Sequence, residues 1–399
     1  FMTKGVKMTN QITFYDTTMR DGEQTIGVNF TIDEKIKLAQ ALEKYGVSAI
    51  EAGFPAASKK DFDAVVEISK VVHTAKVVGL ARLVRQDIDA VVAATQQAKH
   101  PMIHVFIATS PVHRTYKLHM SPSEIIEKVI SDIRYTKTMM SEIIFSPEDA
   151  TRTEPEFLAR VIQAAIESGA TMINIPDTVG YATPYEYGEL FEYLREHVRD
   201  FDQVTWATHT HNDLGMANAN ALAGIMHGAT EIQGTINGIG ERAGNVDIIE
   251  AAAAIYVRRQ TFAKQTAIIL EQSKHISDIV AQATHMPVAK NKPIMGRNAF
   301  AHESGIHQDG YLKNPETYEI LRPEMVGTQA SLPLGKLSGS HAVMNQLLSL
   351  GYHISRQDMV TILPIFKRIA EKTSTVSDQQ MQDMMTMIQT NKMMGAIHE

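Results

Sequence analysis

The hydrophobic and polar positions between residues 11 and 259 follow two alternating periods. Short runs rich in β-branched residues are typical of buried strands. Longer stretches with apolar residues three or four positions apart are typical of amphipathic helices. The runs predict eight strands, at 12–15, 49–52, 76–80, 103–107, 142–145, 172–175, 204–208 and 231–235. A helical pattern follows each strand, and the last such pattern covers residues 247–259.

Four of the predicted helices begin with a hydroxyl residue three positions before a glutamate. The hydroxyl oxygen of such a capping box accepts a hydrogen bond from a free backbone N–H, and the glutamate complements the helix dipole. The four pairs are Thr31 with Glu34, Ser121 with Glu124, Thr153 with Glu156, and Thr183 with Glu186. Each pair predicts where a helix begins.

Eight strand–helix units in about 250 residues match the size of a (β/α)8 TIM barrel. A doubly wound open sheet is the alternative α/β arrangement, but it usually has fewer strands. We therefore predict a barrel over residues 11–260, preceded by an N-terminal extension of residues 1–10. In a barrel of this kind, catalytic residues gather where strands end and helices begin.

After residue 259 the alternation stops, which indicates a smaller and mostly helical appendage. Residues 261–285 have a helical pattern, and glycine and proline then punctuate the chain as far as residue 339. We treat residues 261–339 as a linker subdomain and residues 340–399 as a helical subdomain. The methionine-rich stretch at 381–394 is expected to fill a core or a contact surface rather than to bind a cofactor.

Composition narrows the classes of function. The net charge of -7 at pH 7 provides no basic surface for nucleic acid or anionic lipid. No apolar run approaches the length of a membrane span. The chain has no cysteine, which excludes disulfides, thiolate zinc sites and a cysteine nucleophile. These features favour a cytoplasmic enzyme that acts on small molecules.

Three strand ends carry the residues typical of a metal site. Asp21 follows the first predicted strand, His209 and His211 stand at the end of the seventh, and Asn245 follows the eighth. Residues two apart on a strand point to the same side, and strands seven, eight and one are neighbours in a closed barrel. Two imidazoles, a carboxylate and an amide oxygen suit Mn²⁺ or Mg²⁺ with open positions, or a catalytic Zn²⁺. The alternative is that the two histidines serve packing alone.

The loop after the eighth predicted strand has the glycine spacing G-x-G-x-x-x-G, formed by Gly238, Gly240 and Gly244. This spacing differs from the dinucleotide fingerprint, which also opens a βαβ unit instead of following the last strand. A tight loop that needs positive φ angles is one interpretation. The other is close approach of a thioester or phosphate-bearing group such as acetyl-CoA, helped by Arg242.

These motifs resemble those of the metal-dependent acyl-CoA condensing and lyase barrels. The resemblance to this wider group lies in the strings that begin at Asp16, His209 and Gly238. Further strings, which begin at Glu51, Ser146 and His302, are most similar to the 2-isopropylmalate synthase branch of the alpha-isopropylmalate/homocitrate synthase family. The similarity runs from about residue 11 to about residue 351 and therefore covers most of the chain.

The resemblance implies a role for individual residues. Asp21, His209 and His211 match the metal ligands of the family, and Asn245 matches a fourth ligand that is direct or indirect. Contacts with a 2-oxo acid are implied for Arg20, His104, Ser146 and Thr178. Catalytic roles are implied for Arg20, Glu148, His307 and Tyr318. Structural hydrogen bonding is the alternative for Glu148 and Tyr318, and the residues that flank Tyr318 differ from the family pattern.

The reaction that the resemblance implies is a Claisen-type condensation of acetyl-CoA with 2-oxoisovalerate, followed by release of CoA. Citramalate and homocitrate synthases use the same chemistry on other oxo acids and remain alternatives. The related lyases place a cysteine in the glycine-rich loop, and biotin-dependent carboxyltransferases need a modified lysine near residues 145–148. This chain has neither feature. A metal-binding barrel without catalytic activity is the remaining, weaker alternative.

The resemblance also implies how the chain assembles and is regulated. It implies a homodimer in which the segment around His307 of one subunit reaches the active site of the other. Full-length family members carry a further C-terminal domain that binds leucine. Because this chain stops at Glu399, we expect it to lack that regulatory domain and to show no leucine inhibition.

Overall fold

The computed structural model describes residues 11–330, 333–373 and 375–395. The chain divides into two compact units, and the boundary between them in the sequence lies between residues 288 and 289. The predicted N-terminal extension, residues 1–10, lies outside the described residues. Among the described helices, none combines the length and apolar character that crossing a bilayer requires.

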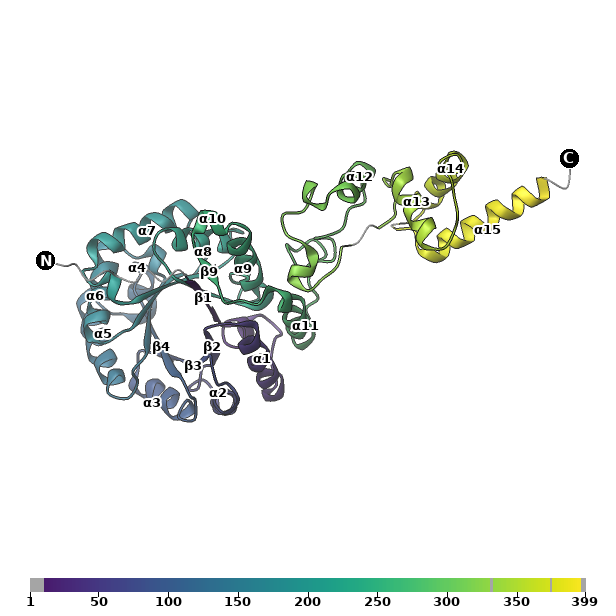
Figure 1. Ribbon diagram of the computed structural model, residues 1–399. Helices are drawn as coiled ribbons and strands as arrows, with labels where there is room; N and C mark the ends of the chain where they lie inside the picture. Colours follow the sequence, from purple (N-terminus) through teal and green to yellow (C-terminus); the bar gives the residue numbers. More distant parts are fainter. Residues whose placement is uncertain (1–10, 331–332, 374, 396–399) are drawn as a thin grey trace. The chain divides into compact units, whose positions relative to one another are not determined.

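The first unit is a closed barrel of parallel strands surrounded by helices (Figure 1). The strands are β1 Gln11–Asp16, β2 Ala49–Gly53, β3 Lys76–Arg82, β4 Pro101–Ala108, β5 Ile143–Glu148, β6 Met172–Asp177, β7 Thr205–Thr210 and β8 Glu231–Gly234. Each strand pairs with the next, and β1 pairs with both β2 and β8, which closes the barrel. The predicted TIM barrel is confirmed, and the open doubly wound sheet is excluded.

The helices of this unit follow the strands in the predicted alternation. They are α1 Ile32–Tyr45, α2 Lys59–Val71, α3 Arg85–Ala94, α4 Pro111–His113, α5 Pro122–Lys137, α6 Pro155–Ser168, α7 Pro184–His197, α8 Ala217–Met226, α9 Ile248–Val257, α10 Arg259–Phe262 and α11 Ser273–Thr284. A π-helical turn, Arg114–Leu118, continues α4 after strand β4. The βα loops therefore gather at the carboxyl ends of the strands, where the barrel carries its site.

Three of the four predicted capping boxes are present, at the starts of α1, α5 and α7. The fourth is wrong. Helix α6 has Glu154 as its N-cap residue, and that side chain makes no capping hydrogen bond. The Thr153 hydroxyl is buried instead, 2.7 Å from the hydroxyl of Thr109, and it donates to the carbonyl of Asp149 at 2.9 Å. Tertiary hydrogen bonds therefore take the place of the local cap at this position.

The predicted helix over residues 261–285 is correct only in its second half. Helix α10 ends at Phe262, and Ala263 has a left-handed φ of 50°. Strand β9, Gln265–Thr266, then runs parallel to the first residues of β1. Helix α11 begins at Ser273, whose hydroxyl oxygen lies 2.9 Å from that of Tyr45 on α1. Because β9 supplies backbone partners to β1, the chain is extended here despite its helical pattern.

A packed apolar layer crosses the barrel interior below its carboxyl end. Seven strands contribute one buried residue each, namely Tyr15, Ala49, Val78, Met102, Ile144, Met172 and Ala207. Filling of this kind makes the interior of a TIM barrel a core rather than a pore. The layer forms the floor on which the polar residues of the site stand.

The second unit is mostly helical. Its helices are α12 Gly305–Lys313, α13 Ser340–Ser349, α14 Met359–Ala370 and α15 Asp378–Gly395 (Figure 1). The last three share a core that includes Val343, Leu347 and Phe366. Met381, Met384 and Met385 are buried in the same core. The prediction that methionines of this stretch fill a core is confirmed for these three, whereas Met387 is 47% exposed.

Candidate active site

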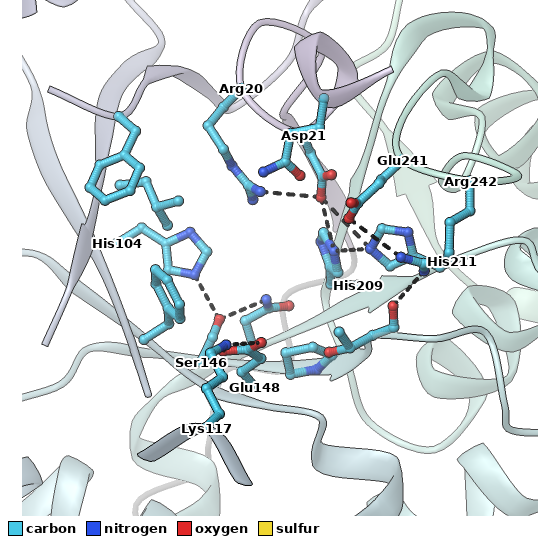
Figure 2. A pocket seen from close by; sticks show the side chains of 17 residues that line it. Arg20, Asp21, His104, Lys117, Ser146, Glu148, His209, His211, Glu241 and Arg242 are labelled. Carbon is cyan, nitrogen blue, oxygen red and sulfur yellow. Dashed lines mark hydrogen bonds and ion pairs between the residues drawn. The ribbon is translucent and has the colours of Figure 1, made fainter. Parts of the chain in front are cut away.

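Residues of the site, all polar except Leu80, form a second layer inside the barrel. They stand two residues beyond the apolar layer on their strands, and because side chains alternate along a strand they face the same interior. This second layer contains Glu51, Leu80, His104, Ser146, Asn174 and His209. All of them except Glu51 line a cavity of about 270 Å³ at the carboxyl ends of the strands (Figure 2).

Asp21, His209 and His211 form one buried cluster on the wall of this cavity (Figure 2). The Nε2 atoms of the two histidines lie 3.2 Å apart. Asp21 Oδ2 lies 3.2 Å from Nε2 of His209 and 3.8 Å from Nε2 of His211. Their ligand atoms all lie within 4.8 Å of one another. Strands β7, β8 and β1 are neighbours, as the sequence predicted, and this order brings the three side chains together.

Two oxygen atoms lack a hydrogen-bond partner among the described residues, one in this cluster and one on Asn245, whose backbone is bridged to that of His211. They are Oδ1 of Asp21 and Oδ1 of Asn245, and both are buried. The amide nitrogen of Asn245 donates to the carbonyl of Ile239 at 3.2 Å. Buried acceptors without a donor are costly unless a cation or water satisfies them. Together with the two imidazoles, they fit the donor set of an octahedral divalent cation.

The protonation states also suit a metal. Burial opposes charge on Asp21, yet Arg20 and the two histidines hold the pKa of its carboxyl well below the usual range. Burial, reinforced by His209, lowers the pKa of His211 to about 4. At neutral pH the cluster therefore holds an ionised carboxylate and a neutral His211 imidazole. Those are the forms in which such side chains bind a metal.

The glycine-rich loop positions Asn245. Gly238, Gly240 and Gly244 have φ angles of 68°, 153° and 88°. A Cβ on Gly240 would lie 2.2 Å from the amide nitrogen of Asn245. The tight-loop interpretation is therefore confirmed. Arg242 uses its guanidinium within the protein, donating to Asp213 Oδ1 at 2.8 Å and to the carbonyl of Thr178 at 2.7 Å.

Arg20 enters the cavity from the loop after β1 and is held by two carboxylates. Its Nε donates to Oε1 of Glu51, and its Nη1 lies 3.3 Å from Oδ2 of Asp21. Glu51 is fully buried and also accepts hydrogen bonds from Tyr15, Thr17 and the Nδ1 of His104. Burial opposes its charge, but Arg20 and His104 hold the pKa of Glu51 below its ordinary value. A guanidinium fixed in this way presents its remaining donors to the cavity (Figure 2).

His104 and Ser146 form a hydrogen-bonded chain across the cavity. Nδ1 of His104 lies 2.6 Å from Oε2 of Glu51, and its Nε2 lies 2.6 Å from the hydroxyl oxygen of Ser146. Burial lowers the pKa of His104. Nδ1 of His104 donates its hydrogen bond to the ionised Glu51, so Nε2 carries no hydrogen and accepts from the hydroxyl of Ser146. The Ser146 oxygen in turn accepts from the amide nitrogen of Asn174 at 2.8 Å. This arrangement fixes the direction of each polar group.

Glu148 and Thr178 stand closer to the mouth. Both side chains line the cavity. The carboxylate of Glu148 accepts two hydrogen bonds from Lys117, at 2.8 and 3.0 Å, and Lys117 belongs to the π-helical turn after β4. The hydroxyl oxygen of Thr178 accepts from the backbone N–H of Asp149 at 2.9 Å.

His307 and Tyr318 belong to the second unit. Their ring centroids lie 4.4 Å apart, and Tyr318 is 44% exposed. The ring of His302 lies 6.1 Å from that of Tyr318, and its Nε2 lies 3.5 Å from a buried oxygen of Glu319. The two side chains with implied catalytic roles in this unit are therefore neighbours.

Several residues of the site carry no motif that sequence reasoning used. Glu51 begins one of the family strings, but nothing in that string predicts that its carboxylate joins Arg20 to His104. Asn174 and Gln233 are polar residues inside otherwise buried strands, and that contrast was the available signal. Lys117 lies on an exposed turn, and no pattern pointed to it.

Two family models match the chain. The HMGL-like model covers residues 11–280, and the homocitrate synthase post-HMGL domain-like model covers residues 294–374. Bacillus subtilis HMG-CoA lyase has a TM-score of 0.59 at 19% identity and covers 73% of this chain and 97% of its own. An Acinetobacter baumannii HMG-CoA lyase, solved with coenzyme A and 3-methylmalate, has a TM-score of 0.58 at 19% identity over 72% and 94%. These likenesses concern the fold.

Curated relatives are much closer in sequence. The 2-isopropylmalate synthase of Staphylococcus saprophyticus is 51% identical over 373 residues, which are 93% of this chain and 73% of that protein. The 2-isopropylmalate synthase of Listeria monocytogenes is 50% identical over 93% of this chain and 73% of its own length. The chain therefore belongs to the HMGL-like family and, within it, to the 2-isopropylmalate synthases.

Proposed function

We propose that this chain condenses acetyl-CoA with 2-oxoisovalerate and water to give 2-isopropylmalate and CoA. The observation that carries the proposal is the buried Asp21–His209–His211 cluster with Arg20 beside it, at the end of a cavity with an apolar wall. The close relatives, which are 2-isopropylmalate synthases, also support it.

The oxo acid would lie between the metal site and Arg20. A divalent cation, Mn²⁺ or Mg²⁺ in our proposal, supplies Lewis-acid polarisation of the keto oxygen when bound to Asp21, His209, His211 and Asn245. Arg20 adds positive charge where the alkoxide develops, with planar donors that suit oxyanions. The hydroxyl of Thr178 would donate to the carboxylate of the substrate, and Ser146, held by His104 and Asn174, would line the same pocket.

The remaining wall of the cavity supports a branched aliphatic oxo acid. Phe54, Leu80, Phe106 and Pro176 line it. An isopropyl group would remove apolar surface from water against these side chains. The methyl group of pyruvate would leave part of the wall uncovered, and the second carboxylate of 2-oxoglutarate would face apolar atoms without a partner. The pocket therefore favours 2-oxoisovalerate over the substrates of the citramalate and homocitrate synthases.

The acetyl group must lose a methyl proton that is much less acidic than any side chain. Positioning of a base therefore matters more than its strength. We assign this role to His307, with Tyr318 against its ring and Glu148 at the cavity mouth as groups that orient or pass protons. Hydrolysis of the thioester then releases CoA. The glycine-rich loop would leave room for the thioester end of acetyl-CoA, and Arg242 would order that loop through Asp213 and Thr178.

A second copy of the chain would complete the site. Large apolar side chains are exposed in segments that follow the strands, among them Ile26 at 98% after β1, Tyr116 at 79% in the π-helical turn, Tyr185 at 74% in the first turn of α7 and Leu214 at 62% after β7. A partner that covered these side chains would remove their apolar surface from water. We propose a homodimer in which the partner's His307 acts at this barrel.

The primary test follows free CoA with a thiol reagent. The purified chain is mixed with acetyl-CoA, Mn²⁺ or Mg²⁺, and 2-oxoisovalerate, pyruvate or 2-oxoglutarate in separate reactions. The absence of cysteine keeps the protein's own background low. We expect release to be fastest with 2-oxoisovalerate and to disappear with a chelator. Preference for another oxo acid would move the chain to a sister synthase, and chelator-resistant release would contradict the metal site.

A subunit-mixing experiment tests the shared site. Asp21→Asn inactivates the barrel of one chain, and His307→Ala removes the base of another. Mixed dimers would contain one intact site, so equal amounts should recover about a quarter of the wild-type activity after subunit exchange. No recovery, despite exchange detected with tagged chains, would contradict the assignment of His307 to the neighbouring barrel.

A further inference from the structure

Gln233 lies beside the metal cluster without belonging to it. It stands on β8, where its backbone is in register with His209 on β7 and with Tyr15 on β1. Its side chain is 1% exposed. The amide oxygen lies 3.2 Å from Nδ1 of His209, and the amide nitrogen has no partner among the described residues. The hydrogen bond of this buried amide is therefore directed to a candidate metal ligand.

The geometry of His209 determines the direction of that bond. Its Nε2 faces Asp21 Oδ2 and His211 Nε2, each at 3.2 Å, so this nitrogen is the one that can bind a cation. Nδ1 must then carry the ring hydrogen, and it donates to the amide oxygen of Gln233. A partner of this kind fixes the tautomer and the orientation of a ligating imidazole and increases its basicity.

The two histidines differ in this respect. Nδ1 of His211 is buried and has no hydrogen-bond partner among the described residues. Within the described residues, a side chain therefore contacts the second ring nitrogen of His209 but not that of His211. Packing alone does not explain Gln233, because an apolar residue of similar length would fill the position without leaving an amide N–H unpaired.

We propose that Gln233 is a positioning residue of the metal site, which keeps His209 in the Nδ1-protonated tautomer with Nε2 aimed at the cation. The inference rests on the divalent metal site of the proposed function. Loss of the acceptor weakens the binding of the metal itself, before any substrate is present. A glutamate in the same place preserves the acceptor and forms a carboxylate–histidine–metal arrangement.

The test is titration of the metal-free chain with Mn²⁺ in a calorimeter, without substrates. The variants are Gln233→Met, which removes the acceptor, and Gln233→Glu, which keeps it. Thr208→Val is the matched control because it removes an unpartnered buried hydroxyl from the neighbouring position, on the opposite side of β7. We expect the dissociation constant to rise about 10–100-fold for Gln233→Met. It should stay at or below the wild-type value for Gln233→Glu and be unchanged for Thr208→Val.

The unfolding midpoint of each metal-free variant separates positioning from packing. A weaker Mn²⁺ affinity with an unchanged midpoint indicates positioning, whereas a weaker affinity with a lower midpoint indicates lost packing. An unchanged Mn²⁺ affinity in Gln233→Met would overturn the inference and leave the metal site intact. An equal loss in the Met and Glu variants would also overturn it, because acceptor chemistry would then not matter. If the wild-type chain bound no Mn²⁺, or Asp21→Asn bound it as tightly, the proposed metal site itself would fail. The inference would fail with it.

Discussion

Glu51 is the buried carboxylate that pairs with the guanidinium of Arg20, and Glu51→Gln should destabilise the barrel. Its Oε1 accepts from Thr17 and Arg20, and its Oε2 accepts from Tyr15 and His104. Glutamine keeps the shape but removes the charge and replaces one acceptor by an NH₂ group. Whichever way the amide turns, that group faces two former donors.

The magnitude follows from these contacts. A hydrogen bond to a charged group contributes about 1.5–3 kcal/mol, and removal of one partner of a buried ion pair costs about 3–5 kcal/mol. The two values overlap, because the Arg20 bond belongs to both. Asp21 still compensates part of the Arg20 charge, and the hydroxyls of Tyr15 and Thr17 can rotate to accept. We therefore expect the free energy of unfolding to fall by about 3 kcal/mol.

The assay uses the single tryptophan of the chain. Trp206 is buried in the barrel, with its ring stacked 4.2 Å from that of Phe201, so its fluorescence reports on this unit. Urea titrations of the wild type and variant give the difference in unfolding free energy. Glu231→Gln is the matched control. Glu231 is also buried in the barrel, but burial raises its pKa, and within the described part of the chain its donors are Thr13 and Ser48. The loss should therefore stay below about 1 kcal/mol.

The pH dependence has a definite sign. The pKa of Glu51 is lower in the folded state than the unfolded value of about 4.3. Its stabilisation is therefore present above that value and is lost as the pH falls toward the folded pKa. The gap between the wild type and Glu51→Gln should narrow below about pH 4. A Glu51→Gln loss no larger than that of Glu231→Gln at neutral pH would refute the role given to the ion pair.

Three further predictions concern the site and its support. Burial raises the pKa of Asp16 to about 7, so this carboxyl should make stability fall as the pH rises from about 4 to about 7. Urea midpoints of Asp16→Asn should lack that fall. Gly240→Ala should weaken Mn²⁺ binding at least about tenfold in calorimetry, because the new Cβ collides with the amide of Asn245. Leu80→Ala should shift kcat/KM about tenfold toward a longer branched oxo acid, and an unchanged ratio would contradict the assigned wall.

The sequence predicted much of the barrel because the relevant signals are local. A period of two or of about 3.6 residues is set by backbone geometry, and three capping boxes lie within one turn of the helices they begin. The exceptions arose where a distant partner competed. Thr153 bonds to Thr109 instead of capping α6, and residues 265 and 266 pair with β1 instead of forming a helix.

The metal cluster was also predictable, because closure of an eight-stranded barrel makes the first and last strands neighbours. That single topological fact brings Asp21 beside His209 and His211, and the structure places their ligand atoms within 4.8 Å. The tight turn of the last loop was predictable for a local reason, because glycine is the residue type that adopts positive φ angles without strain.

What only the tertiary structure decided is which polar side chains become partners inside the barrel. Glu51 joins Arg20 to His104, Gln233 meets His209, and Lys117 pairs with Glu148. These contacts depend on strand register and on which layer of the barrel each residue occupies, and neither is written in the local pattern of the chain. Periodicity and strand order specify where side chains point, whereas the distances at which they meet are set only when the barrel closes around its packed floor.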